Sequence, residues 1–205
     1  VASGEARRLM ETPQYETDAR ISPQGNFVSF IREQNLYVID LDNGEESAVT
    51  TEGGGLVSWG MAEFVAQEEL DRRTGYWWSP DERYIAIARV DESPVDNIER
   101  MEIAADGSAE VVDQRYPRAG TDNAIVELFI LDRETGERRQ VELADTDDIY
   151  LARVNWSRDS GTATTGVCRK TGDSAQAMSV SDSMTVDAIL KAPPGLLMSP
   201  CRLLV

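Results

Sequence analysis

The chain has 205 residues, 41% of them apolar, and carries a formal net charge of −17 at pH 7. Long-range repulsion from such a charge opposes binding to nucleic acid and to anionic membrane surfaces, so we expect neither partner. No apolar run reaches the roughly 18 residues that a membrane-spanning helix needs. The simplest role of the charge is solubility, and an acidic interior that attracts amines is the alternative.

The sequence contains no histidine and no Gly-x-Ser-x-Gly motif. A Ser-His-Asp triad needs an imidazole to take and return the proton, so we expect the chain by itself to hold no catalytic residue. Its two cysteines, Cys168 and Cys201, make no zinc site without histidine, and we expect no metal and no cofactor. Because the chain begins with Val1 and shows no leader, we expect the natural N-terminus upstream, and exported and cytoplasmic locations both stay open.

The first predicted elements are two β-strands. Residues 22–31 open with a Ser-Pro turn, continue to an aromatic residue and enter a β-rich apolar run. Residues 36–40 read Leu-Tyr-Val-Ile-Asp and are followed by a turn that contains Gly44 and Glu45. We therefore expect an antiparallel pair of strands here.

The next predicted element is a helix over residues 61–72, which Thr74 and Gly75 end. On a wheel at about 100° per residue, Glu68 and Glu69 fall within the apolar arc. Burying a carboxylate costs several kcal/mol, so these two either pair with an arginine or line a cavity that receives a cation. The apolar arc of the wheel consists of Met61, Ala62, Phe64, Val65, Ala66 and Leu70. The polar arc consists of Glu63, Gln67 and Asp71. Arg72 and Arg73 are the candidate partners nearby.

Residues 79–132 repeat the first unit. Residues 79–88 match 22–31, and residues 128–132 match 36–40, with the same spacing from the aspartate to a Gly-Glu turn. The added segment, roughly residues 91–123, predicts an elaborated loop and hairpin. Such repeats are typical of β-propeller blades, whose strands depend on stacking against neighbouring blades. We therefore expect an all-β, partial β-propeller with a short inserted helix.

A third copy begins at residues 155–160, but residues 161–166 lack the expected apolar strand. No aromatic residue follows up to Val205, and the acidic excess disappears. We therefore divide the chain into a partial β-propeller over 1–160 and an atypical tail over 161–205. A frameshift in the coding DNA is our hypothesis for the tail, and a variable or disordered linker is the alternative.

The segment from Glu63 to Pro80 contains Gln-Glu-Glu-Leu-Asp-Arg-Arg-Thr-Gly-Tyr-Trp-Trp-Ser-Pro. It resembles the double-glutamate motif of the dipeptidyl peptidase IV family, prolyl oligopeptidase-type serine peptidases, in a form closest to bacterial members. The resemblance covers roughly residues 15–160. It implies that Glu68 and Glu69 bind the free N-terminus of a peptide substrate. It also implies about three blades of an eight-bladed propeller, followed by a catalytic α/β-hydrolase domain that this chain lacks.

The same resemblance implies an exopeptidase that releases dipeptides with Pro or Ala in second place, and a homodimeric parent enzyme. Two alternatives stay open at the level of sequence. The chain could be a non-enzymatic β-propeller that serves as a binding module, or a truncated gene product without function. The binding module explains the repeats equally well, but it does not explain a helix inserted before a Trp-Trp strand.

Overall fold

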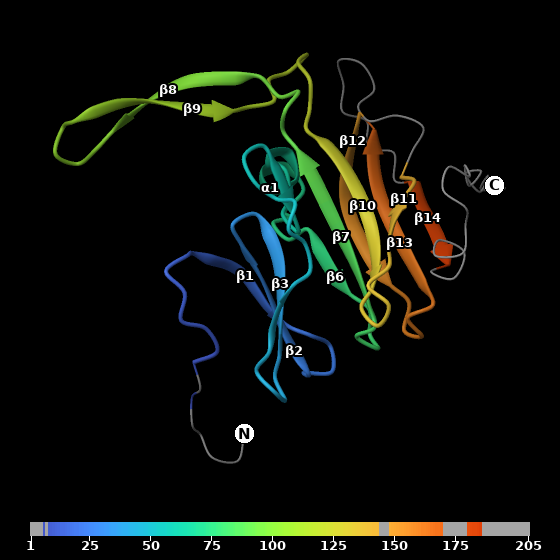
Figure 1. Cartoon of the computed structure of the whole chain (residues 1–205). Coiled ribbons are helices and arrows are strands. Elements are labelled where there is room, and N and C mark those ends of the chain that lie inside the picture. The colour runs from blue at the N-terminus through green and yellow to red at the C-terminus, as the bar shows by residue number, and fades with distance from the viewer. Residues whose placement is uncertain (1–5, 7, 144–147, 170–179, 186–205) are drawn as a thin grey trace.

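The computed structural model describes residues 6, 8–143, 148–169 and 180–185. Within these residues, the regular structure is antiparallel β-sheet apart from one short helix. The strands form three sheets and a separate hairpin (Figure 1). This arrangement confirms the predicted all-β class.

The first sheet is a four-stranded meander in which each strand pairs with the next. The two inner strands are mostly buried, whereas the last strand is exposed along its whole length. Its strands are β1 (Glu16–Ile21), β2 (Phe27–Arg32), β3 (Asn35–Asp40) and β4 (Glu46–Ala48). The two strands predicted from the first repeat unit are therefore the inner strands of this sheet.

The second sheet has the order β11-β10-β7-β5, and β6 also pairs with β7. Its strands are β5 (Val57–Trp59), β6 (Tyr76–Trp78), β7 (Tyr84–Asp91), β10 (Ile125–Asp132) and β11 (Arg138–Val141). Trp59 pairs with Arg89 and Tyr76 pairs with Ile87, so β5 and β6 lie along consecutive parts of the same neighbour. They therefore form one edge strand, interrupted by an excursion over residues 60–75.

The third sheet contains β12 (Ile149–Trp156), β13 (Thr162–Arg169) and β14 (Val180–Thr185). The hairpin of β8 (Asn97–Ile103) and β9 (Ala109–Arg115) connects β7 to β10 and projects from the sheets as an arm (Figure 1). This hairpin lies within the predicted insertion at residues 91–123 and confirms it.

The three sequence repeats form the same hydrogen-bonded turn. In each copy the serine N–H donates to the carbonyl of the residue five positions on, and the serine Oγ accepts the N–H of that residue. The pairs are Ser22–Phe27, Ser79–Tyr84 and Ser157–Thr162, with backbone N···O distances of 2.9, 2.9 and 2.8 Å. The later turns also agree, because Gly44 N–H donates to Asp40 O and Gly136 N–H to Asp132 O, both at 2.8 Å.

The third copy continues into a strand, with Ala163 paired to Trp156 across β12 and β13. Ala163, Thr165 and Val167 are buried. The change of composition at residue 161 therefore does not interrupt the sheet at that point. The division of the chain at residue 160 and its explanation by a frameshift stay predictions, and most of residues 170–205 lie outside the described residues.

The core lies between the sheets, and the alternating side chains of β7 contribute to both of its halves. Ala86, Ala88 and Val90 pack toward β10, β12 and β13, whereas Ile85 and Ile87 belong to the cluster that contains residues of β2 and β3. A strand that is buried on both faces belongs to a sheet stacked between two others, which is how propeller blades pack. The described sheets are therefore blades of a partial β-propeller.

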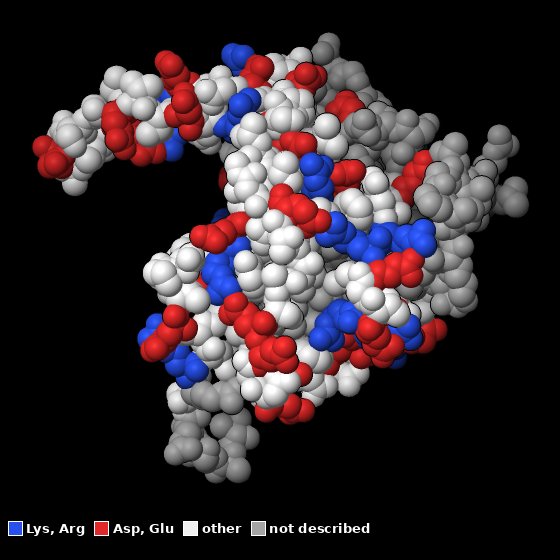
Figure 2. Space-filling model, in the orientation of Figure 1, with Lys and Arg blue, Asp and Glu red and all other residues white. Residues whose placement is uncertain are grey.

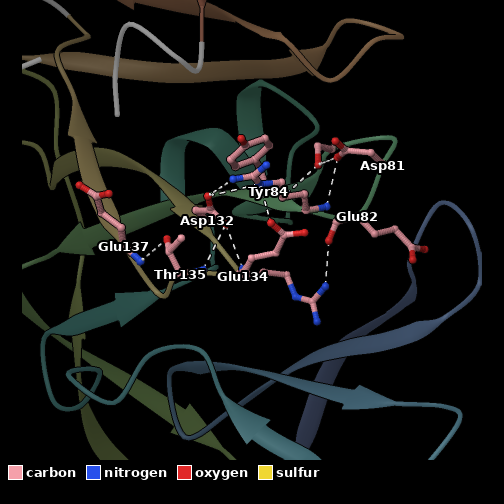
Figure 3. Close-up of polar contacts among 10 residues, drawn as sticks. Asp81, Glu82, Tyr84, Asp132, Glu134, Thr135 and Glu137 are labelled. Atoms are coloured by element: carbon pink, nitrogen blue, oxygen red, sulfur yellow. Dashed lines mark hydrogen bonds and ion pairs between the residues drawn. The ribbon is translucent and has the colours of Figure 1, made fainter. Parts of the chain in front are cut away.

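Turns of neighbouring blades are joined by hydrogen bonds. Glu82 of the second Ser-Pro turn accepts the Gln24 N–H at 2.6 Å and the Asn26 side-chain amide at 2.8 Å, both from the first turn. On the other side, Asp81 N–H donates to Ser160 Oγ at 3.0 Å. Figure 3 shows Asp81 and Glu82 of the second turn together with Asp132, whose carboxylate accepts from the Glu134 backbone N–H. Burial opposes ionisation of Glu82, but these hydrogen bonds outweigh it and lower the pKa of this carboxyl.

The acidic charge is spread over the surface. On the face shown in Figure 2, Asp and Glu side chains lie along the β8–β9 arm and over the sheets, with basic side chains among them. Such mixing supports the reading of the charge as a solubility feature on this face. Among the described residues, no helix has the length and apolar character needed to cross a membrane.

Candidate functional site

The excursion from the edge strand carries the only helix among the described residues, α1 (Phe64–Glu69). It is shorter than the predicted range of 61–72, because the chain before Phe64 is extended and Asp71 adopts a left-handed φ of 49°. Figure 1 shows α1 below the base of the β8–β9 arm, and the helix packs against β12 of the third sheet. The ring of Phe64 packs edge-on against Tyr116 of that base, with centroids 5.0 Å apart.

Two glycines allow the chain to close the neck of this excursion. Gly60 has a φ of +75°, and a Cβ there would lie 2.6 Å from Ile31 Cδ1. A Cβ on Gly75 would lie 2.3 Å from the carbonyl oxygen of Met61. Gly75 N–H donates to Gly60 O at 2.9 Å, so the outgoing and returning strands are in direct contact. Only a residue without a side chain fits where the two strands approach so closely.

Glu68 and Glu69 lie at the C-terminal end of α1, and both are exposed. The wheel prediction that they point into a buried apolar arc was wrong: the helix is only six residues long, Ala66 is its one buried residue, and Phe64 and Val65 beside the glutamates are only half-buried. Within the described part of the chain, neither carboxylate has a hydrogen bond or an ion pair. The predicted alternative of a buried ion pair between these glutamates and Arg72 or Arg73 is therefore not what the structure contains.

The buried carboxylate of the excursion is Glu63 instead, which the wheel had placed on the polar arc. Its Oε2 accepts from Arg72 Nη2 at 2.9 Å, and both side chains are at most 4% exposed. Burial raises the pKa of Glu63, although the charge of Arg72 and nearby backbone N–H groups oppose this. Burial likewise lowers the pKa of the Arg72 guanidinium. Both charges are thus desolvated, and each depends on the other.

Arg72 also joins the excursion to the third sheet. Its Nε donates to the carbonyl of Leu151 in β12 at 2.8 Å, and its Nη1 donates to Thr74 O at 2.8 Å. A second arginine acts nearby, since Arg153 Nη1 donates to Leu70 O at 2.8 Å. The turn that carries Glu68 and Glu69 is therefore fastened at its C-terminal side to a neighbouring blade.

A small cavity of about 10 Å³ lies beside the start of α1. Glu63, Phe64, Glu92, Asn123 and Tyr150 contribute to its lining. The second carboxylate oxygen of Glu63, Oε1, makes no hydrogen bond of good geometry with the described residues. A cavity of this size holds about one water molecule, so it is too small for a peptide.

The Trp-Trp strand β6 connects the excursion to both neighbouring sheets. Trp78 Nε1 donates to Ser29 Oγ at 2.9 Å in the first sheet, and Trp156 Nε1 of the third sheet donates to Trp77 O at 3.0 Å. The two tryptophans that the sequence singled out are thus structural parts of the blade junctions. They place the end of the excursion firmly between three sheets.

Stacked antiparallel blades, one with an acidic helical excursion in its edge strand, define this chain as a β-propeller region. The family described as "Dipeptidyl peptidase IV (DPP IV) N-terminal region" matches residues 1–188. The chain therefore belongs to this family, as the resemblance of residues 63–80 predicted.

Two curated relatives are fungal proteins described as probable dipeptidyl-aminopeptidase B. The one from Pyrenophora tritici-repentis is 34% identical over 139 residues, which are 62% of this chain and 16% of that protein. The one from Phaeosphaeria nodorum is 32% identical over 158 residues, or 70% of this chain and 17% of that protein. The chain thus spans about one sixth of the length of these relatives.

Among solved structures, the crystal structure of Porphyromonas gingivalis dipeptidyl peptidase 4 is similar to this chain with a TM-score of 0.72 and 27% sequence identity. The match covers 78% of this chain and 23% of that protein. The predicted nearness to bacterial members is supported by this structure, whereas the two curated relatives above are fungal.

Proposed function

We propose that this chain is the part of a serine-type dipeptidyl peptidase that anchors the N-terminus of a peptide substrate and gates its access to the active site. The observation that carries the proposal is a pair of adjacent, exposed carboxylates, Glu68 and Glu69, on an excursion that the fold holds firmly; among the described residues neither carboxylate has an ion-pair partner. Membership in the family and the names of the relatives support the peptidase activity of the whole protein.

The chemistry of the pair suits a peptide amine. A substrate ammonium offers three donors, and two carboxylates offer about four acceptor sites. Two negative charges side by side also repel each other, so the empty pair favours the arrival of a cation. An amine held at a fixed distance from a nucleophile presents only one peptide bond for cleavage, which gives release of dipeptides. We propose dipeptides with Pro or Ala in second place.

The bond-breaking groups belong to another part of the protein. Without histidine, this chain lacks the imidazole that acts as general base in a Ser-His-Asp triad. We therefore propose that an α/β-hydrolase domain supplies the triad in the complete enzyme, which we propose to be a homodimer. Accordingly, the purified chain alone is expected to show no turnover of Gly-Pro or Ala-Pro chromogenic substrates, and measurable turnover in a contaminant-free sample would contradict this.

A second role, a non-enzymatic binding propeller, rests on the repeats alone. The blade structure supports a binding propeller as well as it supports a peptidase. A binding propeller, however, does not explain the helical excursion from the edge strand. A reading frame downstream that encodes Gly-x-Ser-x-Gly with later Asp and His favours the peptidase, and its absence favours the binding module or a decayed gene.

The anchor is tested in the complete enzyme with Glu68→Gln and Glu69→Gln. Each loses one charged partner of the substrate ammonium, so we expect kcat/KM for a free-amine dipeptide substrate to fall by about 2 kcal/mol of transition-state stabilisation, roughly thirtyfold. Steady-state kinetics measures this, with Glu45→Gln, an exposed carboxylate in the β3–β4 turn, as the control. Wild-type kinetics in both anchor variants would contradict the assignment.

A further inference from the structure

We infer that the buried pair of Glu63 and Arg72 is the positioning device of the substrate anchor: it fixes where Glu68 and Glu69 stand relative to the rest of the propeller. The inference rests on the proposed function of these two glutamates. It assigns a role to two residues that do not reach the exposed anchor surface themselves.

The pair closes the segment that carries the anchor. Glu63 immediately precedes α1, and Arg72 follows the turn after it, so their ion pair joins the two ends of the segment from residue 63 to residue 72. The backbone reinforces this closure, since Arg72 N–H donates to Ala66 O at 3.0 Å. A helix of six residues is too short to be stable by itself. Its geometry therefore depends on contacts at its ends.

Arg72 then fixes the closed segment to the body of the protein. Its guanidinium donates to Glu63, to Thr74 O at the returning strand, and to Leu151 O in the neighbouring blade. Its centre also lies 5.8 Å from the ring centroid of Trp77. The planar fork of arginine uses its donors in fixed directions, so these contacts set orientation as well as distance. No lysine could reproduce this set.

The contrast between buried and exposed acids supports the same conclusion. A charged pair removed from water is a weak source of stability compared with apolar packing, because desolvation offsets its Coulombic attraction. Buried ionic pairs are instead used in some proteins to specify one arrangement of the chain. Here the pair specifies the arrangement in which Glu68 and Glu69, four and three residues before Arg72, are exposed to solvent.

The test uses the complete enzyme and the variants Arg72→Met and Glu63→Gln, each made in the wild-type background and in the Glu68→Gln/Glu69→Gln background. A covalent serine reagent counts the active sites, so that kcat/KM is expressed per competent enzyme. In the wild-type background, we expect Arg72→Met to lower kcat/KM for a free-amine dipeptide substrate by about tenfold or more, since small displacements of positioning groups have effects of this size. In the background without anchor carboxylates, we expect almost no further loss, because Arg72 acts through them.

Arg32→Met is the matched control. Arg32 is also a buried arginine with a carboxylate partner, Glu46, but its side chain contacts the first sheet, where it lies over the rings of Phe30 and Tyr37. We expect it to lower the melting temperature and to leave kcat/KM per active site unchanged. If Arg72→Met yields no soluble enzyme, Glu63→Gln decides the question by the same comparison, because it keeps the shape of the side chain and removes its charge.

The possible outcomes distinguish failure of the positioning role from failure of the proposed anchor. If Arg72→Met lowers kcat/KM equally in both backgrounds, Arg72 does not act through the anchor carboxylates, and the inference is overturned. The absence of any loss of kcat/KM in the wild-type background would also overturn it. If Glu68→Gln/Glu69→Gln itself has wild-type kinetics, the proposed anchor fails, and the positioning role fails with it. A large effect of the anchor variants together with no effect at Arg72 and Glu63 would overturn the positioning role alone.

Discussion

Single residues of the excursion divide into those that meet solvent and those that hold the chain in place. Glu68 and Glu69 are exposed, whereas Glu63 is buried against Arg72. The sequence could not predict this division. The ion pair between Glu63 and Arg72 depends on where the helix starts and on the position of Leu151 in another blade. Neither can be predicted from the local sequence pattern.

Gly75 is the residue whose size matters most at the neck of the excursion. A Cβ at this position would meet the backbone carbonyl of Met61 at 2.3 Å, and the backbone would have to move. We expect Gly75→Ala to lower the free energy of unfolding by about 3 kcal/mol, the range for forced repacking. Chemical denaturation of the complete enzyme measures this change. Gly161→Ala is the control, because its Cβ would meet only the flexible Asp159 side chain, at 3.4 Å, and should change little. Equal stability of the two variants would contradict the proposed close approach.

At the scale of elements, the blade repeat was predictable because its signals are local. A serine five residues before the strand residue that it contacts forms the same turn in all three copies. The boundaries of α1 were predicted less well, since the predicted helix also included residues 61–63 and extended past residue 69 to residue 72. Contacts with β12 and the β8–β9 base determine those boundaries, and they become visible only in the folded chain.

The Ser-Pro turns also give a prediction about pH. Hydrogen bonds from the first turn hold the pKa of Glu82 below its ordinary value of 4.5, so the folded state binds this proton less tightly than the unfolded state. The stabilisation is therefore complete above about pH 4.5 and is lost as pH falls through the lowered pKa of the folded state. We expect the melting temperature to fall on acidification below about pH 4.5, and to fall less steeply in Glu82→Gln than in the wild type.

The same variant should be less stable than the wild type at neutral pH, where the charged acceptor is missing. Differential scanning calorimetry across this pH range measures both effects. Glu45→Gln, which changes an exposed carboxylate outside the Ser-Pro turns, should keep the wild-type pH dependence. If Glu82→Gln kept it as well, the coupling between the first two blades would not depend on this carboxylate.

At the scale of the whole molecule, we propose that the chain holds the substrate-anchoring region of an enzyme whose catalytic groups lie in another domain. Three stacked blades, the family match over residues 1–188 and the exposed glutamates support this account together. The fold class was predictable from repeats because blades repeat in sequence. Which residues of the excursion are exposed and which hold it in place was not predictable, because this depends on contacts where three sheets meet.

The most direct test of the central claim is the selectivity of the complete enzyme for a free α-amine. The measurement compares kcat/KM for a dipeptide chromogenic substrate with kcat/KM for its N-acetylated counterpart, in the wild type and in Glu68→Gln/Glu69→Gln. The account predicts a strong preference for the free amine in the wild type and a loss of most of that preference in the double variant, because an acetylated nitrogen carries no charge for the carboxylates to bind. An unchanged preference in the double variant would contradict the account.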